Sequence, residues 1–316
     1  MSEEATSFER EYPMKLLGLS CGRKNGNGEI LLKEALLAVQ EAGGIDVEIV
    51  RLLDLDINPC TGCEGCTQSM SKGGTGECVQ WKNDDALWLR DRFDACDGLI
   101  TSAPCFVLRP SGRFCTMNDR FLGFGPKFLM GVFHRKKRIA AAIASGGSDW
   151  TQLMMSQMMP ALFMLNMKVV DQFQANWVAS PGHVLLRDDL IGRARRLGVN
   201  VASAMKKPVE EAAFMGDRPG TCPYCHTDLV TLQKKRVVEC PICGIKGEIS
   251  IKGDEISVAW IEEDIKHIRW EPLGMKSHFN DIKETHGKFA QGKEMASARI
   301  GKYTAFAPYV KPKANA

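Results

Sequence analysis

Residues 14–52 read MKLLGLSCGRKNGNGEILLKEALLAVQEAGGIDVEIVRL and predict one strand–loop–helix–strand unit. The opening MKLLGLS is an apolar run of strand length. ILLKEALLAVQE then places its apolar residues at helical spacing, and Gly43-Gly44 ends that pattern. DVEIVRL alternates apolar and polar residues, as a half-buried strand does. Two strands joined by a helix run parallel, so this stretch predicts an α/β fold built on a parallel sheet.

The loop between Ser20 and Glu29 follows the first predicted strand and precedes the first predicted helix. Open α/β sheets bind phosphate at this place, through backbone N–H groups and the helix dipole. The glycines do not fit the dinucleotide fingerprint, and no Gly-Lys-Ser/Thr follows to make a Walker loop. Four side chains offer donors for a mononucleotide phosphate: Ser20, Arg23, Asn25 and Asn27. A polar connecting loop without a ligand is the alternative.

The same alternation of helix and strand continues to about residue 207. The predicted elements are a helix over 84–95, a strand from Gly98 that ends at Pro104–Val107, a helix over 111–121, a strand over 139–145, a methionine-rich helix over 151–167, a strand over 168–173 and a helix over 187–205. The methionine-rich helix is typical of adaptable core or subunit packing. The loops after Ser20, Val107 and Ser145 all follow strands, so they converge on one edge and predict a concave site.

A basic run, HRKKR, occupies residues 134–138 just before the strand IAAAIAS. Such a run ordinarily forms the solvated start of a strand. Its charge could also attract the 2′-phosphate of NADPH.

A cysteine loop, PCTGCEGCTQSMSKGGTGEC, spans residues 59–78. Cys60, Cys63 and Cys66 stand at two-residue intervals, and Cys78 follows after a glycine-rich span that would let it reach back. This spacing suits a cubane iron–sulfur cluster. Tetrahedral zinc and a surface loop of free thiols are the two alternatives.

Two knuckles, Cys222-Pro-Tyr-Cys225 and Cys240-Pro-Ile-Cys243, form a second metal motif. The stretch between them can form a hairpin that joins the knuckles, and four thiolates suit a structural tetrahedral zinc. A rubredoxin-like iron is the minor alternative. A domain this small buries little core, so we expect the metal to carry its stability.

The bulk composition is that of an ordinary globular protein with about two domains. The 316 residues are 44% hydrophobic and 25% charged, and the net charge of +3 weighs against nucleic acid as a partner. The N-terminus lacks the pattern of a secretory signal, and no run of 18 apolar residues predicts a membrane span. Twelve cysteines without a secretion signal predict a reducing cytoplasm and metal sites in place of disulfides.

These patterns divide the chain into four parts. We expect a cofactor-binding domain over 13–207, a linker over 208–217, a zinc ribbon over 218–261 and a C-terminal extension over 262–316. The extension is basic and has helical potential near His278–His286. It is expected to be a surface extension, or else to wrap a neighbouring subunit or the edge of the cofactor site.

Three separate segments resemble one protein family. GLSCGRKNGNGEILLKEAL is similar to the first segment of the NAD(P)H-dependent FMN reductases of flavodoxin-like fold, and SAPCFVLRPSGRFCTMNDR is similar to their second. The cysteine loop followed by Asp84-Asp85 resembles the iron–sulfur flavoprotein branch of that family. The resemblance covers about Lys15 to Phe173 and leaves out the ribbon and the tail.

The resemblance implies a five-stranded parallel sheet with helices on both faces and FMN at its carboxyl edge. Its phosphate loop matches Ser20, Arg23, Asn25 and Asn27, and Gly28 is expected to bind the cofactor beside them. The segment beside the flavin ring matches Pro104, Cys105, Phe106 and Val107, and the third flavin loop matches Ser145, Gly146 and Gly147, with Trp150 close by. The cluster ligands match Cys60, Cys63, Cys66 and Cys78. Two departures stand out. Gly28 replaces a common Thr or Ser, and the gap from Cys66 to Cys78 is longer than usual.

The implied function is that of an FMN-dependent NAD(P)H oxidoreductase. Flavin carries the chemistry, so no side chain is assigned a catalytic role. Electrons would pass to a quinone, a nitro- or azo-aromatic or another small acceptor, and a 4Fe–4S cluster is a further possible route. Two alternatives stay open: an electron-transfer protein that works with a ferredoxin, and a redox-sensing module that binds through the ribbon. We also expect a homodimer or homotetramer.

Overall fold

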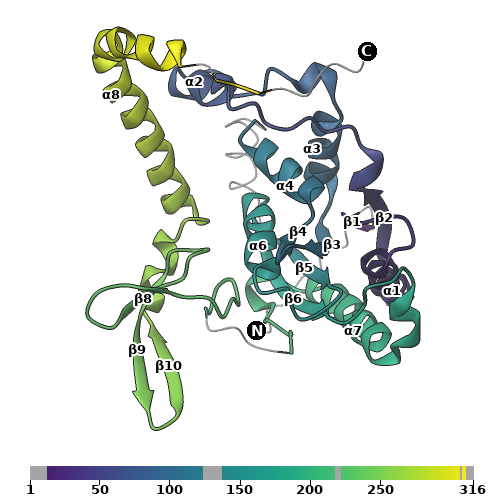
Figure 1. Cartoon of the computed structure of the whole chain (residues 1–316). Coiled ribbons are helices and arrows are strands. Elements are labelled where there is room, and N and C mark those ends of the chain that lie inside the picture. The colour runs from purple at the N-terminus through teal and green to yellow at the C-terminus, as the bar shows by residue number, and fades with distance from the viewer. Residues whose placement is uncertain (1–12, 124–136, 218–221, 307, 311–316) are drawn as a thin grey trace, which may run out of the picture.

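A twisted parallel sheet forms the centre of the molecule (Figure 1). The computed structural model describes residues 13–123, 137–217, 222–306 and 308–310. Five parallel strands follow the order β2-β1-β3-β5-β6. Their bounds are β1 Met14–Ser20, β2 Ile45–Arg51, β3 Gly98–Phe106, β5 Arg138–Ser145 and β6 Met167–Ala175, and the short β4, Arg109–Pro110, pairs antiparallel with β3. The predicted flavodoxin-like sheet is confirmed.

Helices cover both faces of this sheet because its inner strands are apolar on both sides. On one face, Leu16 and Ile100 pack with α1 and α7; on the other, Leu17 and Leu99 pack with α3, α4 and α6. The helices run α1 Asn27–Glu41, α2 Gly65–Ser71, α3 Ala86–Ala95, α4 Gly112–Arg120, α6 Met154–Met164 and α7 Asp188–Met205. Short 3-10 turns occupy Leu52–Asp54, Trp81–Asn83, Phe121–Gly123, His183–Leu186, Val209–Glu211 and Glu262–His267.

The predicted methionine-rich helix is shorter than its sequence pattern. It ends at Met164, and Met167 is the first residue of β6. Asn166 lies between them with φ +53°, a left-handed conformation that turns the chain from helix into strand. Met154, Met158 and Met159 are fully buried in the core, which confirms their predicted packing role.

The C-terminal third contains a four-stranded antiparallel sheet and one long helix. The strands are β7 Thr231–Leu232, β8 Val237–Glu239, β9 Lys246–Lys252 and β10 Glu255–Trp260, in the order β10-β9-β8-β7. Helix α8 runs over Pro272–Ala305 and reaches from this small sheet to α2 (Figure 1). It is far longer than the helical potential expected near His278–His286. None of the described helices is long and apolar enough to cross a membrane.

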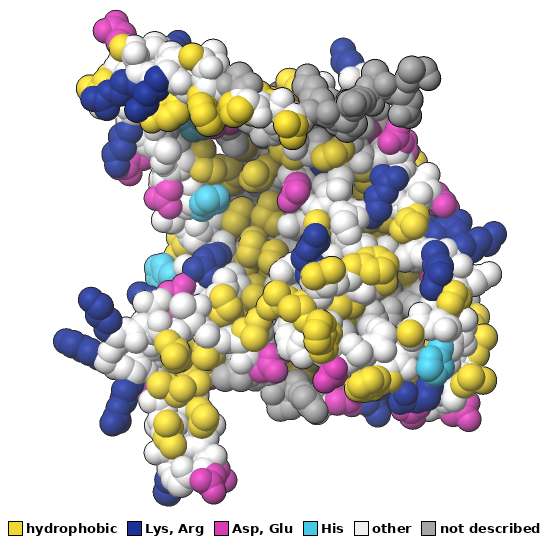
Figure 2. All heavy atoms as spheres, viewed as in Figure 1, with side chains coloured by type: hydrophobic (Ala, Val, Ile, Leu, Met, Phe, Trp, Pro, Cys, Tyr) yellow, Lys and Arg dark blue, Asp and Glu magenta, His cyan; other side chains and the backbone are white. Residues whose placement is uncertain are grey.

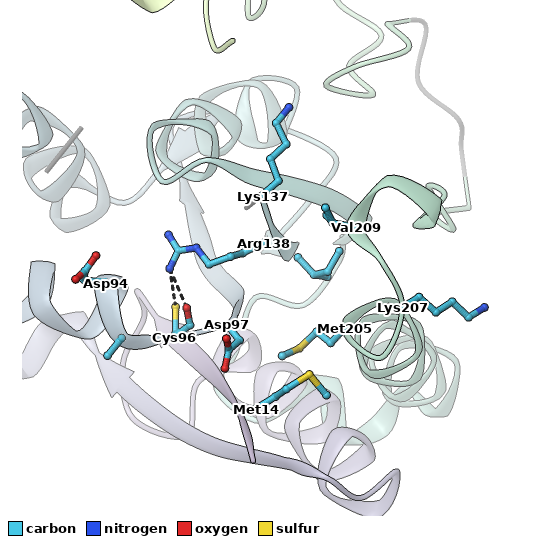
Figure 3. A pocket seen from close by; sticks show the side chains of 11 residues that line it. Met14, Asp94, Cys96, Asp97, Lys137, Arg138, Met205, Lys207 and Val209 are labelled. Atoms are coloured by element: carbon cyan, nitrogen blue, oxygen red, sulfur yellow. Dashed lines mark hydrogen bonds between the residues drawn. The ribbon is translucent and has the colours of Figure 1, made fainter. Parts of the chain in front are cut away.

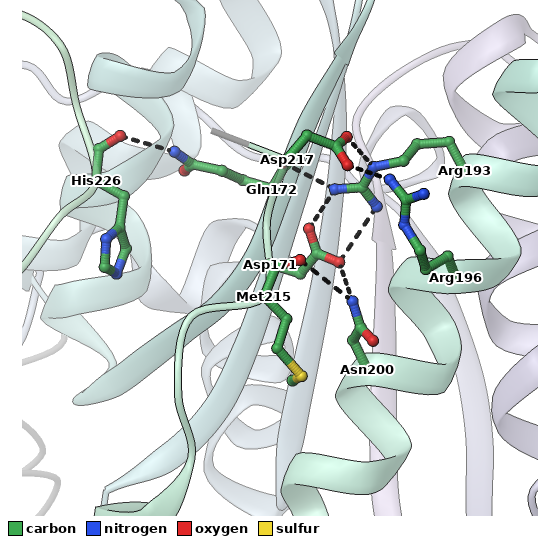
Figure 4. Close-up of polar contacts among 8 residues, drawn as sticks. All are labelled: Asp171, Gln172, Arg193, Arg196, Asn200, Met215, Asp217 and His226. Atoms are coloured by element: carbon green, nitrogen blue, oxygen red, sulfur yellow. Dashed lines mark hydrogen bonds and ion pairs between the residues drawn. The ribbon is translucent and has the colours of Figure 1, made fainter. Parts of the chain in front are cut away.

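The segment 208–217, expected to be a linker, packs against the sheet. Val209 and Ala212 are buried, and the Met215 N–H donates to the Val170 carbonyl at 2.7 Å. At the end of this segment, Asp217 pairs with Arg193 (Figure 4). Arg193 also pairs with the fully buried Asp171 of β6. This network ties the chain that leads to the ribbon onto the edge of the sheet.

The ribbon itself docks on α6 and β6. Tyr224 packs its ring 5.2 Å from that of Phe163, and Gln172 donates a hydrogen bond to the His226 carbonyl at 3.1 Å (Figure 4). Burial lowers the pKa of His226 to about 4, so this ring is neutral where it stacks on Phe214. The four ribbon cysteines therefore belong to the same buried apolar cluster as α6.

Candidate flavin site and metal centres

The carboxyl ends of three neighbouring strands meet at one edge of the sheet. Ser20 of β1 lies beside Ser102 of β3, and Pro104 of β3 lies beside Ser145 of β5. The Cys21 N–H donates to the Ser102 carbonyl at 2.8 Å, which extends the β1–β3 ladder into the first loop. The three loops predicted to bind flavin therefore adjoin one another.

The first loop leads into α1, whose N-terminus has no side-chain cap. The first N–H groups of a helix lack intrahelical partners, and the helix dipole makes the place favourable for an anion. Asn25 takes a left-handed conformation, with φ +53°, before Gly26 closes the turn by donating to the Arg23 carbonyl at 3.0 Å. Arg23 and Lys24 are exposed beside this turn. The geometry suits a phosphate group.

Three of the predicted phosphate donors already have partners within the protein. The Asn27 amide donates to the carbonyls of Val178 and Ser180 at 2.6 and 2.8 Å, and its oxygen accepts from a third backbone group. Ser20 donates its hydroxyl to Glu29 at 3.1 Å. The side-chain oxygen of Asn25 accepts from Lys33. The sequence pattern missed Glu29 and Lys33, because acidic and basic residues in a helix are ordinarily solvated.

Gly28 is explained by packing. A Cβ built at this position would lie 2.7 Å from the Ser102 hydroxyl oxygen and 3.1 Å from that of Ser145. The Ser102 hydroxyl also donates to the Gly28 carbonyl at 2.8 Å. Helix α1 thus approaches the sheet more closely than a Thr or Ser at this position would allow.

Replacing Gly28 by Ala is therefore expected to weaken both folding and FMN binding. The added methyl must push α1 away from β3 and β5, and overpacking of this kind costs about 1–3 kcal/mol. Urea unfolding and FMN titration would measure the two effects. Gly287→Ala, on α8 with open space around its Cβ position, serves as the control. Equal stability and FMN affinity in Gly28→Ala and the unchanged chain would contradict this packing argument.

The second loop is a tight hairpin between β3 and β4. Its two central residues, Val107 and Leu108, have φ of +52° and +68°. Left-handed backbone is costly for a β-branched residue, and such strain concentrates at functional sites. Val107 and Phe106 are exposed at the tip, whereas the Cys105 thiol donates to the Trp150 carbonyl at 3.1 Å. Burial raises the pKa of the Cys105 thiol.

The third loop, from Ser145 to Trp150, packs against a fourth loop that the sequence did not identify. Gly146 accepts from the Val178 N–H at 3.0 Å, and a Cβ at Gly147 would lie 3.4 Å from Ala179. Trp177, in this fourth loop, has φ +63° and an exposed ring. The sequence did not predict this fourth loop as part of a site, because its residues form an irregular stretch that contains Ser, Pro and Gly and no recognisable motif.

Large apolar side chains stay exposed around this edge of the sheet. We call them the apolar rim: Phe106, Val107, Trp150, Trp177, Leu185 and Leu186. Their exposed fractions run from 59% for Phe106 to 88% for Val107. Side chains of this size are ordinarily buried, so their concentration at one edge marks a ligand or partner surface.

Lys137 and Arg138, the described end of the basic run before β5, lie at the opposite edge of the sheet. Arg138 starts β5, where its guanidinium donates to the carbonyls of Phe93 and Cys96 at 2.6 and 2.8 Å. It lines a cavity of about 250 Å³ at the amino ends of the strands (Figure 3). Arg138 and Lys137 therefore line the amino edge of the sheet, away from the loops at its carboxyl edge. The attraction of the NADPH phosphate by this basic run stays a prediction. Residues 134–136 lie outside the described part.

The cysteine loop surrounds the start of α2. Burial raises the pKa of Cys66, and the neighbouring Cys78 and Cys60 raise it further. Cys63 is exposed, and the Gly65 N–H lowers its pKa. The loop cysteines are not among the described thiols that lie within 4.8 Å of one another.

A buried ion pair clamps both ends of this loop. Arg120 and Asp84 pair with almost no exposed surface, and Arg120 also donates to the Asn58 carbonyl at 2.8 Å. The second guanidinium nitrogen lies 3.5 Å from the Cys78 sulfur. Although burial raises the pKa of Asp84, the hydrogen bonds from Arg120 and the backbone lower it overall.

The four ribbon thiols form a compact group. Cys222, Cys225, Cys240 and Cys243 are fully buried, and their sulfurs lie within 4.8 Å of one another. The Cys222–Cys243 and Cys225–Cys240 sulfur distances are both 3.4 Å. Tetrahedral zinc with bonds of about 2.3 Å places its ligand sulfurs about 3.8 Å apart. The arrangement therefore fits one metal ion.

A cleft of about 880 Å³ separates the N-terminal part of α8 from α4 and α6. Figure 2 shows hydrophobic side chains gathered in this hollow beside the body of the molecule. Its described lining includes Cys60, Asn118, Phe121, Met164, Trp270 and Phe279. The cysteine loop, which contains α2, thus contributes Cys60 to the wall of this cleft.

The profile of the NADPH-dependent FMN reductase family matches residues 14–180, which is more than half of the chain. This chain therefore belongs to the NADPH-dependent FMN reductase family. It is a flavin-dependent oxidoreductase whose flavodoxin-like domain contains the edge described above.

Two flavone-named relatives match most of this chain, whereas an iron–sulfur flavoprotein matches a smaller part of it. Flavone synthase cfoJ of Aspergillus candidus is 28% identical over 86% of this chain and 89% of its own length. A solved flavone reductase is 29% identical, with a TM-score of 0.75, over 95% of this chain and all of that one. Iron-sulfur flavoprotein MJ1083 of Methanocaldococcus jannaschii is 28% identical over 61% of this chain and 98% of its own length.

Proposed function

We propose that this protein uses NAD(P)H and FMN to reduce a planar aromatic acceptor. The apolar rim carries this proposal, because it places exposed aromatic rings beside the loops expected to hold the flavin. The flavone-named relatives support this acceptor class, since they match nearly the whole chain. We therefore add flavone-type enones to the quinones and nitro- or azo-aromatics expected from the sequence.

The residues at this edge would bind and orient FMN. The α1 N-terminus and Arg23 would hold the phosphate, the Pro104–Val107 segment would support the flavin ring, and the Ser145–Gly147 turn would close over it. Bound FMN supplies hydride transfer between NAD(P)H and the acceptor. Phe106, Trp150 and Trp177 would stack on the acceptor and exclude water from the reacting edge.

The metal sites have separate proposed roles. We assign one structural zinc to Cys222, Cys225, Cys240 and Cys243, and a 4Fe–4S cluster to Cys60, Cys63, Cys66 and Cys78. The cluster would let the protein exchange electrons with a ferredoxin in addition to NAD(P)H. The similarity to iron-sulfur flavoproteins supports that second function. We also propose a homodimer or homotetramer that acts in the cytoplasm.

Steady-state turnover by the FMN-loaded protein tests the main proposal. Anaerobic mixing with NADH or NADPH should bleach the flavin, and flavone, a quinone or an azo dye should restore its colour. Trp150→Ala and Trp177→Ala are each expected to lower kcat/KM for the aromatic acceptor about tenfold, since stacking and lost apolar burial together contribute about 1–2 kcal/mol.

Trp88→Ala is the matched control, because Trp88 is an exposed tryptophan on α3 that stacks with Arg92 outside the rim. Unchanged turnover in both rim variants would contradict the acceptor site. A flavin that NAD(P)H does not bleach, but that reduced ferredoxin does, would favour the electron-transfer function instead.

A further inference from the structure

We propose that Glu29, supported by Lys33, is a positioning residue that shapes the phosphate loop for FMN. This proposal rests on the flavin site described above. Glu29 is 4% exposed, and its carboxylate accepts hydrogen bonds from the Ser20 hydroxyl at 3.1 Å and from the Asn25 N–H at 3.2 Å. One carboxylate thus joins the end of β1, the loop and the first turn of α1.

Lys33 completes the arrangement one helical turn later. Its ammonium lies 2.7 Å from the Glu29 carboxylate and donates to the side-chain oxygen of Asn25 at 3.0 Å. Asn25 is therefore held through both its backbone and its side chain. A non-glycine residue with positive φ persists only where its surroundings enforce it, and Glu29 and Lys33 are those surroundings.

The charge balance favours a phosphate. A buried carboxylate beside an anion site would repel the anion if it were unpaired, but Lys33 neutralises it. Burial raises the pKa of Glu29, and the hydrogen bonds from Lys33 and Asn25 outweigh that effect and lower it, so the carboxylate stays ionised. The exposed Arg23 and Lys24 then leave the loop with a net positive charge.

Phosphate binding consequently depends on backbone shape more than on side-chain donors. The Ser20 hydroxyl and the Asn25 side chain are held by Glu29 and Lys33, which leaves the N–H groups of the first turn of α1, together with Arg23, for the ligand. A loop preorganised in this way gains affinity because less ordering is required on binding. Glu29 should therefore matter for FMN and not for riboflavin, which has no phosphate.

Titration of the full-length apoprotein with FMN and with riboflavin tests this role. Glu29→Ala should weaken FMN binding about tenfold or more, because it removes the charged acceptor that holds the loop in its binding conformation. Its riboflavin affinity should remain within a factor of about three of the unchanged chain. Glu29→Gln keeps an acceptor for Asn25 and should restore most of the FMN affinity.

Two further variants keep the result interpretable. Lys33→Met leaves the Glu29 carboxylate unpaired and should weaken FMN but not riboflavin, even if Glu29→Ala fails to fold. Glu41→Ala, at the far end of α1, should change neither affinity. Tighter FMN binding by Glu29→Ala, or an equal loss for both flavins, would overturn the proposal. Absence of FMN binding by the unchanged chain would instead contradict the flavin site itself.

Discussion

Replacing Cys240 by Ser is expected to release the ribbon metal and to destabilise the whole chain. We have assigned a structural zinc to the four ribbon thiolates, and such an ion contributes about 10–16 kcal/mol to small zinc domains. The ribbon packs on α6, where the ring centroids of Phe163 and Tyr224 lie 5.2 Å apart, and the Trp270 ring that follows the ribbon lies 5.9 Å from that of Phe163. Loss of the metal should therefore loosen α6 and the adjoining sheet.

Metal content and thermal unfolding would measure this effect. The unchanged chain should contain one zinc per ribbon, whereas Cys240→Ser should contain almost none and unfold at a clearly lower temperature. Cys115→Ser is the control, since this half-buried thiol belongs to neither cysteine group. A variant that keeps its zinc, or that unfolds at the same temperature, would show that the four thiols do not hold a stabilising metal.

Replacing Arg120 by Met is expected to cost about 3–5 kcal/mol of unfolding free energy, because it leaves Asp84 buried without its partner. The two side chains are 1% and 0% exposed, so no solvent compensates the carboxylate. Urea unfolding would measure the loss. Arg187→Met, which breaks an exposed pair with Asp189, should have little effect.

The same pair predicts a dependence on pH. The pKa of Asp84 is lower in the folded chain than in the unfolded chain, so its stabilising contribution is present above the ordinary Asp pKa. That contribution is lost as the pH falls through the lowered folded pKa. An Arg120→Met variant should lack this part of the acid dependence. An unfolding free energy within error of the unchanged chain at neutral pH would contradict the clamp.

The Arg120 variant should also disturb the cysteine loop. Arg120 holds Asn58 before the loop and lies 3.5 Å from the sulfur of Cys78 at its end. If the loop carries a cluster, the iron content of anaerobically purified protein should fall together with the stability. The zinc content should stay the same, because Arg120 is not part of the ribbon.

Much of the fold followed from local patterns. Apolar runs of strand length, separated by helical spacing, predicted all five parallel strands, and strand ends predicted which loops meet. The knuckle spacing predicted the compact group of four thiols. These features are readable because strand and helix periods, glycine stops and metal-ligand spacing are properties of short stretches.

Other features depended on contacts between distant residues. Gly28 looked like a missing hydroxyl donor, and the structure showed a close approach to Ser102. Trp177 joined the rim only because its loop packs on Gly146. The segment 208–217 has the composition of a linker, and its hydrogen bond to β6 became visible only in the structure.

The sequence alone thus determined the order of the elements, the edge at which the three candidate flavin loops meet and the two groups of cysteines. The tertiary structure decided how those parts are used: that Glu29 and Lys33 engage the expected phosphate donors, that Arg120 clamps the cysteine loop, and that the ribbon shares a core with α6. The physical reason is burial. From the sequence alone, a charged residue is expected to be solvated and a glycine to be flexible. Only the packing around them shows which partner the charge has and which neighbour the glycine leaves space for.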